Sequence, residues 1–286
     1  MRGIHVQTTI SLARTALAVL LCGLCGCVSQ SPYPSEATRA QFKTIGVVAA
    51  RFAPDVRWYL PAKGGGEGAA RGSAIGAMTP MAFFAQGSGS GGCGGDYALL
   101  CAAPLALGLA LAPLGAVVGA VAGAVSALPA ATVEEAEANL QKALAGAMLQ
   151  EKLRDSVVRL TREQTRYLVV KDEGRGPRAR DERADYREWT GTNVDTVLEV
   201  SIDTLILDGP LAIDPTLRIE MVARAKLIRT HDGVELHDTL WNCAGAERLL
   251  AEWIKDGAKP LRDEVARCMN GLAGLMVEAL FLNHPL

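Results

Sequence analysis

A run of 37 uncharged residues separates Asp96 from Glu134 and interrupts an otherwise ordinary pattern of charged and apolar residues. Glycines recur at intervals of four residues inside this run and again upstream of it. They are Gly68, Gly72 and Gly76 in the first segment and Gly115, Gly119 and Gly123 in the second. This spacing places each set on one face of a helix, where small residues let another helix approach closely.

The two segments resemble the glycine-zipper hairpins of bacterial envelope proteins over roughly residues 64–130. The resemblance implies two close-packed helices joined by a turn, which a bridge between Cys93 and Cys101 would clamp. Residues 105–128 would extend about 36 Å as one helix, enough to cross a hydrocarbon core of about 30 Å, but Pro113 would kink it. The segment at 61–131 is therefore either a membrane-associated hairpin or a flexible or protein-buried loop.

The N-terminal 26 residues have the features of a secretion signal. They contain Arg2 and Arg14, no acidic residue, and an apolar run too short for an ordinary membrane span. Leu24-Cys25-Gly26-Cys27 resembles a bacterial lipobox, which implies cleavage before Cys27, acylation of Cys27 and a tether over 27–41. Because Val28 is not Asp, the enteric-type sorting rule implies the outer membrane. An ordinary signal peptide and an uncleaved anchor helix are the alternatives.

Four cysteines besides Cys27 remain after such cleavage, an even number in a compartment that permits disulfides. The simplest of three connectivities joins Cys93 to Cys101 and Cys243 to Cys268. None of the four has the CxxC or Cys/His spacing of a zinc site, so we expect no metal.

The remaining chain predicts an α/β (α+β) fold, formed by residues 42–60 and 132–286, with a small sheet, a long helix and a closing helix. Residues 42–60 supply a first strand. Thr132 and Glu135 have capping-box spacing, and apolar residues then recur at helical intervals to Leu160. Further strands are expected at 167–170, 197–207 and 217–227. In the strand at 197–207 we expect Leu198, Val200, Ile202 and Ile206 on the buried face.

Asp232-Gly233 predicts a two-residue hairpin turn, with Leu227 opposite Asp238 and Ala225 opposite Leu240. A closing helix is expected to begin near Ala246, pause at 256–257 and resume at Pro260. Its buried stripe would consist of Leu261, Val265, Cys268, Leu272, Leu275 and Leu280. A Cys243–Cys268 bridge would attach this helix to the sheet.

The order of these elements resembles the small α/β domain of the curli-secretion channel lipoprotein and of the lipoprotein activator of penicillin-binding proteins. The resemblance rests on element order and implies a domain that binds an envelope partner or oligomerises. The Gly/Ala-rich insertion differs from the strands with which the curli channel builds its pore.

The sequence contains no GxxxxGK[ST], HExxH or GxSxG signature, and we expect no catalytic residue and no cofactor. His231 and His237 flank the turn, where exposed histidines are favoured over a metal pair. Asp195, Glu199 and Asp203 are interpreted as a solvated row, and residues 171–187, rich in both charge signs, as a solvated loop. Trp241 and Trp253 are interpreted as core residues or, alternatively, partner contacts.

We therefore expect a non-enzymatic lipoprotein of the bacterial outer membrane, facing the periplasm and anchored through acylated Cys27. Its expected partner is another envelope protein or a second copy, and the net charge of -2 gives no case for nucleic acid. Two alternatives remain: an oligomeric membrane assembly or secretion-pore component, and an envelope hydrolase or metal-dependent enzyme.

Overall fold

A computed structural model describes residues 33–87, 112–113 and 116–282 of the chain. The predicted signal peptide, Cys27, Gly115 and the Cys93–Cys101 pair lie outside the described residues. The described residues form one compact unit by their contacts.

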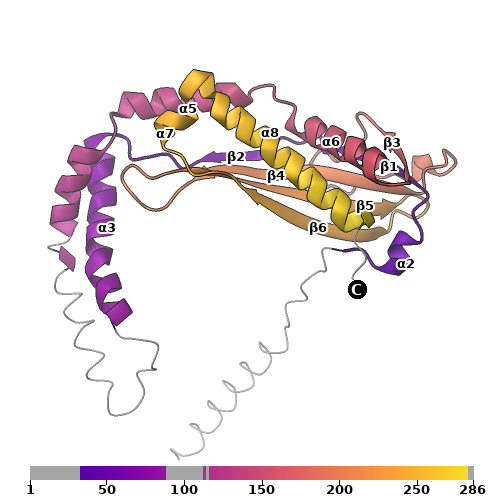
Figure 1. Ribbon diagram of the computed structural model, residues 1–286, viewed down its shortest axis with the longest axis horizontal. Helices are drawn as coiled ribbons and strands as arrows, with labels where there is room; N and C mark the ends of the chain where they lie inside the picture. The colour runs from indigo at the N-terminus through magenta and orange to yellow at the C-terminus, as the bar shows by residue number, and fades with distance from the viewer. Residues whose placement is uncertain (1–32, 88–111, 114–115, 283–286) are drawn as a thin grey trace, which may run out of the picture. The chain divides into compact units, whose positions relative to one another are not determined.

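A six-stranded mixed sheet is the centre of this unit, which confirms the expected fold class (Figure 1). Its strands are β1 Thr44–Ala49, β2 Asp55–Trp58, β3 Leu168–Lys171, β4 Thr196–Asp208, β5 Arg218–Arg229 and β6 Glu235–Ala244. The order is β3-β1-β4-β5-β6, and β2 pairs with the second half of β4. β1 runs parallel to β3 and β4, whereas β4, β5 and β6 are antiparallel. Residues 42–60 thus contain two strands and not one.

Helices cover one face of the sheet and enclose the main core (Figure 1). Those in this layer are α5 Ala130–Leu144, α6 Leu149–Gln164, α7 Leu250–Trp253 and α8 Lys255–Val277, followed by a π-helical turn, η3 Glu278–Leu282. Two further helices, α2 Glu36–Arg39 and α3 Gly64–Gly87, lie outside this layer. A further helical stretch, residues 116–126, pairs with α3. α6 packs on β1 and β4 and α8 on β5 and β6, so that both bury their apolar stripes against strands.

The prediction of one long helix over 132–160 is wrong, because the chain turns between α5 and α6. Gly146 and Met148 have φ values of 69° and 48° there, which a continuous right-handed helix does not allow. The break lets α5 pack against α8 while α6 also reaches the sheet. α5 begins at Ala130 with Pro129 as its N-cap, so Thr132 forms no capping box.

The prediction that Ile206 lies on the buried face is wrong, because β4 contains a bulge. The pairing of β4 with β5 shifts between Ile202 and Thr204, and the alternation of side chains reverses beyond that point. Leu205 and Leu207 are therefore fully buried in the core, and Ile206 is only half-buried on the other face.

The β5–β6 hairpin forms, but its expected register is wrong by one residue: Leu227 lies opposite His237, and Ala225 opposite Thr239. The predicted two-residue turn needs positive φ at both central positions, and of Asp232 and Gly233 only Gly233 has it, at 71°. Instead Gly233 N donates to the carbonyl of Arg229 over 2.9 Å, in a longer loop.

The closing helix pauses where expected, with positive φ at Asp256, Gly257 and Ala258. Its predicted stripe is buried except for Leu275, which is 46% exposed, because Met276 takes the inward position. Within the described residues one helical stretch, Lys255–Leu282, is long and apolar enough to cross a membrane, and 56% of its apolar window is buried in the domain. Its contacts with the sheet identify it as a core helix.

Candidate functional site

Glycines of α3 and of the 116–126 helix lie directly against one another. A Cβ atom added to Gly72 would overlap the carbonyl oxygen of Gly119, and one added to Gly119 would overlap the carbonyl oxygen of Gly72. Gly68 and Gly123 block each other in the same way. The Cα of Gly76 would lie 3.2 Å from a Cβ on Gly119. The backbones are therefore so close that only glycine fits at these contacts.

Charged side chains are concentrated at the base of this two-helix hairpin. The Nζ of Lys63 lies 2.8 Å from Oε2 of Glu137, and Glu67 Oε1 accepts a hydrogen bond of 2.7 Å from Arg71. Arg71 also donates to the carbonyl of Leu60, and Gly64 N donates to the carbonyl of Leu128 over 2.8 Å. These bonds join the two helices to the polypeptide of the α/β domain at the point where they begin and end.

One helix of the hairpin exposes four valines. Those of the 116–126 helix are between 63% and 82% exposed, and they are Val117, Val118, Val121 and Val125. At about 100° per residue they lie on the side opposite Gly119 and Gly123. Asp96 is the only charged residue in the sequence between Arg71 and Glu134. The helix pair thus has a glycine contact inside and, among the described residues, an exposed apolar surface outside.

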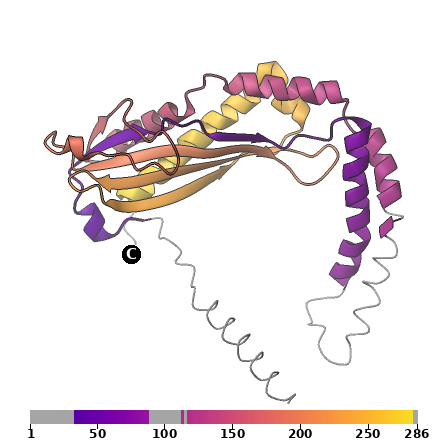
Figure 2. The same cartoon turned by 180° about the vertical axis from the view of Figure 1, so that it is seen from behind.

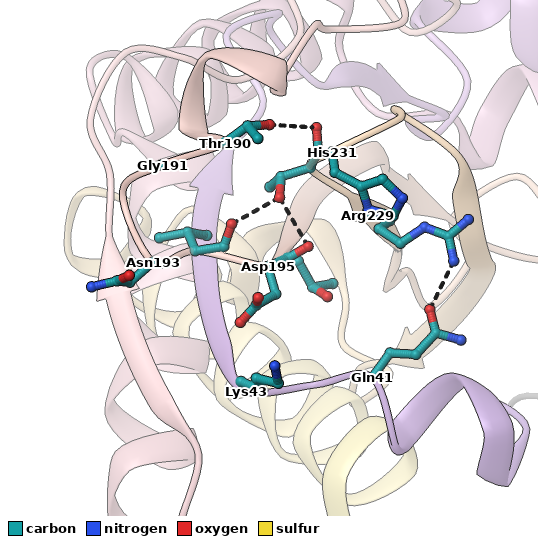
Figure 3. A pocket seen from close by; sticks show the side chains of 11 residues that line it. Gln41, Lys43, Thr190, Gly191, Asn193, Asp195, Arg229 and His231 are labelled. Carbon is teal, nitrogen blue, oxygen red and sulfur yellow. Dashed lines mark hydrogen bonds between the residues drawn. The ribbon is translucent and has the colours of Figure 1, made fainter.

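A polar cavity of about 580 Å³ lies where β4 begins and β5 ends (Figure 3). Its walls include Gln41, Lys43, Thr190, Gly191, Asn193, Asp195, Arg229 and His231. Its polar groups connect neighbouring segments. Arg229 donates to Gln41 Oε1 over 3.0 Å, Thr230 Oγ1 donates to the carbonyls of Val194 and Asp195, and Asp195 Oδ2 accepts from the amide of Thr44. The bonds hold the segment before β1 and the first residue of β1 to the rest of the sheet.

The second face of the sheet is crossed by the segment 172–195 (Figure 2). Tyr186 and Trp189 of this segment are buried in a small cluster with Val48 and Val197. Arg180 donates to the carbonyl of Asp203. The interpretation of 171–187 as a solvated loop is therefore wrong for the part that folds back onto the strands.

Glu199 is buried beneath this segment, at 6% exposure, and accepts a hydrogen bond of 2.6 Å from the hydroxyl of Tyr186. Burial raises the pKa of the Glu199 carboxyl, although Tyr186 and Lys226 oppose that change. Burial and the nearby carboxylate also raise the pKa of Tyr186. The prediction of a solvated acidic row is thus wrong for Glu199. Sequence reasoning missed Tyr186 and Trp189, whose only signal was two aromatic residues in a charged run.

The other two acidic residues are separate from Glu199. Asp195 lines the cavity described above, and Asp203 forms a 3.2 Å ion pair with Arg224, which also bonds Asp238 over 3.1 Å. The structure therefore joins Asp203 and Asp238 through one arginine and does not assemble an acid-base pair from the three predicted residues.

His231 and His237 are not brought together as ligands. His237 Nε2 lies 2.7 Å from the hydroxyl of Thr239, and the His231 side chain is exposed beside Asp232. In the described ranges no group of three His, Cys, Asp or Glu side chains is placed to hold a metal. Trp253 is fully buried, with Nε1 donating to the carbonyl of Leu217, and Trp241 packs partly buried against the core.

Cys243 at the end of β6 and Cys268 in α8 form a disulfide in the structure, with their Cα atoms 5.6 Å apart. The guanidinium of Arg267 lies 3.8 Å and 3.7 Å from the two sulfur atoms and bonds Glu264. This link attaches the closing helix to the edge strand of the sheet.

No family model and no curated protein matches the sequence. Several solved structures are similar to part of it, among them the following two. Protein XCC0632 from Xanthomonas campestris, described as DUF330, is 17% identical with a TM-score of 0.28, over 46% of this chain and 61% of that protein. Hypothetical protein CT253 from Chlamydia trachomatis is 10% identical with a TM-score of 0.30, over 46% of this chain and 83% of that protein. The chain thus spans less than two thirds of the Xanthomonas protein.

Proposed function

We propose that this chain is a non-enzymatic lipoprotein of the bacterial outer membrane, anchored through acylated Cys27. In this proposal the α/β domain faces the periplasm and the glycine-packed hairpin enters the lipid bilayer as a second attachment. The supporting observation is the surface of the hairpin, where exposed valines lie opposite the glycine contact and where, among the described residues, charges occur only at the base.

The distribution of charge supports lipid as the occupant of the valine face. Lys63, Glu67 and Arg71 belong to the start of α3 and its base, where water and headgroups can solvate them. From Gly72 to Gly87 α3 continues for 16 residues without a charge, about 24 Å at 1.5 Å per residue. That length reaches most of the way through a hydrocarbon core of about 30 Å. In lipid the exposed valines carry no cost, whereas in water they do.

The two described helices of the hairpin meet the main requirement of a segment in lipid. Backbone groups there must be bonded within the segment, and helices satisfy them internally. Lipid tails are as apolar as the valines, so close backbone packing at small residues is what holds two helices together in a bilayer. The reciprocal fit of Gly72 with Gly119 supplies such packing.

Mass spectrometry of the mature N-terminus tests the anchor. We expect Cys27 to be the first residue and to carry acyl chains, and Cys27→Ala to abolish both the cleavage and the modification. An unmodified N-terminus on a protein that is freely soluble after cell lysis would contradict the anchor.

Flotation with vesicles of phosphatidylethanolamine and phosphatidylglycerol tests the hairpin separately. The chain without residues 1–26 and carrying Cys27→Ala is used, so that neither the signal segment nor acyl chains contribute to binding. Adding Val117→Lys, at the exposed valine farthest from the charged base, should release the protein from the vesicle fraction, because a lysine at the centre of the hydrocarbon core costs about 2.5–3.5 kcal/mol. Val234→Lys, at an exposed valine of the β5–β6 loop, is the matched control and should float as the parent does. Equal flotation of the Val117 variant and the control would refute membrane insertion.

A further inference from the structure

β6 is an edge strand whose outer side faces no described strand. It spans ten residues, Glu235–Ala244, and contains no Pro, Lys or Arg. Protein sheets usually protect such edges with short strands, proline or lysine. The opposite edge shows that protection, because β3 has only four residues and ends in Lys171. β6 therefore has the features of an edge that pairs with another strand.

The hydrogen-bond pattern identifies which groups point outward. Gly245 N donates to the carbonyl of Ile219 over 2.7 Å, just beyond the last β5–β6 pair. Since bonded and non-bonded pairs alternate in an antiparallel ladder, the odd-numbered residues of β6 bond to β5. The N–H and C=O groups of Asp238, Leu240 and Asn242 are consequently directed to the open side.

The side chains divide in the same alternation. Trp241 packs against the core and Cys243 is bonded to Cys268 in α8, so the odd-numbered side chains face the helices. Leu240 lies on the other face and is 51% exposed, opposite Arg224 of β5. Asp238 on this face is already paired with Arg224, which leaves Leu240 as the apolar residue at the edge.

We propose that the open edge of β6 binds β6 of a second copy of this chain in antiparallel pairing. With a two-fold axis at Leu240, residues whose numbers sum to 480 lie opposite each other. Leu240 then meets Leu240 of the second copy, and Asp238 meets the second copy's Asn242. Residues 236–244 all take part in the pairing, and no like charges are opposed. About six backbone hydrogen bonds form, two for each of the outward-facing residues Asp238, Leu240 and Asn242. The two sheets become one continuous sheet.

Self-complementarity favours a second copy over an unrelated strand. Pairing at Leu240 covers an exposed leucine with its own equivalent and places a carboxylate opposite an amide that can donate to it. Glu235, the other acidic residue of the strand, falls outside the paired stretch, where it opposes the second copy's Gly245. The pairing does not depend on the hairpin or on Cys27.

Cysteine cross-linking of the full chain in detergent tests the register. Directly opposed residues of a bonded pair have Cα atoms about 5.5 Å apart, within the range of a disulfide. Leu240→Cys should give a dimer under mild oxidation that dithiothreitol reverses. The control is Leu168→Cys, an exposed leucine on the other edge strand, which should give no more dimer than the parent chain. Equal dimer yields from the two variants would overturn the proposal.

A second measurement does not require an introduced thiol. Leu240→Lys places two like charges opposite each other and should halve the mass measured by light scattering, while Leu168→Lys should leave it unchanged. Circular dichroism of both variants monitors the fold. Retention of the dimer by a folded Leu240→Lys protein would exclude β6 as the interface. When Gly119→Leu is added to the Leu240→Cys variant, the cross-link should still form. Loss of the cross-link in this double variant would assign the association to the hairpin.

Discussion

The hydroxyl of Tyr186 donates a 2.6 Å hydrogen bond to Oε1 of Glu199 on the face of the sheet opposite α6 and α8. The bond joins the segment 172–195 to the centre of β4 and satisfies a carboxyl group that is almost fully buried. Hydrogen bonds to charged groups contribute about 1.5–3 kcal/mol, more than neutral ones. Burial of Glu199 disfavours its charged form, so this pair connects the stability of the domain to pH.

Glu199→Gln should remove the contribution of Glu199 to the pH dependence of the free energy of unfolding. The pKa of Glu199 is raised above 4.5 in the folded protein, first by burial, with Glu235 and Asp238 acting in the same direction. Its contribution to stability is therefore fully present below about pH 4.5 and is lost as the pH rises through the folded-state pKa. The glutamine variant should equal the parent near pH 4 and exceed it at pH 7, by about 1.4 kcal/mol for each pKa unit of the rise.

Urea unfolding at both pH values measures this difference. Glu188→Gln, which neutralises an exposed carboxylate of the same segment, is the control and should change stability little at either pH. Parallel stability profiles of Glu199→Gln and the parent between pH 4 and 7 would show that Glu199 is not the group that titrates.

Tyr186→Phe should destabilise the protein by about 1–3 kcal/mol at pH 7, because it leaves a buried carboxylate without its donor. The cost should be smaller near pH 4, where the carboxyl group is neutral. When Glu199 is replaced by Gln, the destabilisation caused by Tyr186→Phe at pH 7 should fall towards the destabilisation that Tyr186→Phe causes in the parent at pH 4. A double-mutant cycle by urea unfolding measures this coupling, and additive effects would contradict the hydrogen bond.

Gly119→Leu should open the hairpin, since its side chain would have to occupy the space of the Gly72 carbonyl group. Insertion of bulk into a close contact typically costs about 1–3 kcal/mol. Elastase cleavage within 116–126, followed by mass spectrometry in detergent, should become several-fold faster, with the urea midpoint of the α/β domain unchanged. Gly66→Leu is the control, because nothing lies within 4 Å of a Cβ at Gly66. Equal cleavage of the two variants would argue against the glycine contact.

The parts of the fold that follow from periodicity could be predicted. The spacing of four residues between glycines places Gly68 and Gly72 on the face that meets Gly119 and Gly123. The alternation of apolar and polar residues identified β4 and β5. The bulge at Ile202, the reversal at Gly146 and the loop type at Gly233 were not predictable, since each depends on how two distant elements fit. The burial of Glu199 depends likewise on a segment that the alternation of β4 does not contain.

Reduction of the Cys243–Cys268 bond should lower the free energy of unfolding by roughly 3 kcal/mol in the chain-entropy model, since the bond closes a loop with a sequence separation of 25 residues. Cys268 is fully buried against the sheet, so its thiol would also remain in the core after reduction, and α8 should keep its place at low denaturant. In dithiothreitol we expect a lower urea midpoint than without it. Without urea, the reduced protein should keep a native circular dichroism spectrum. Cys243→Ser, which removes the bond at the less buried partner, should reproduce that midpoint and make it insensitive to dithiothreitol.

Peptide mapping of protein isolated from the cell envelope, without reductant, should recover the two cysteines in one linked peptide. Recovery of both as free thiols would refute the bond and weaken the case for export.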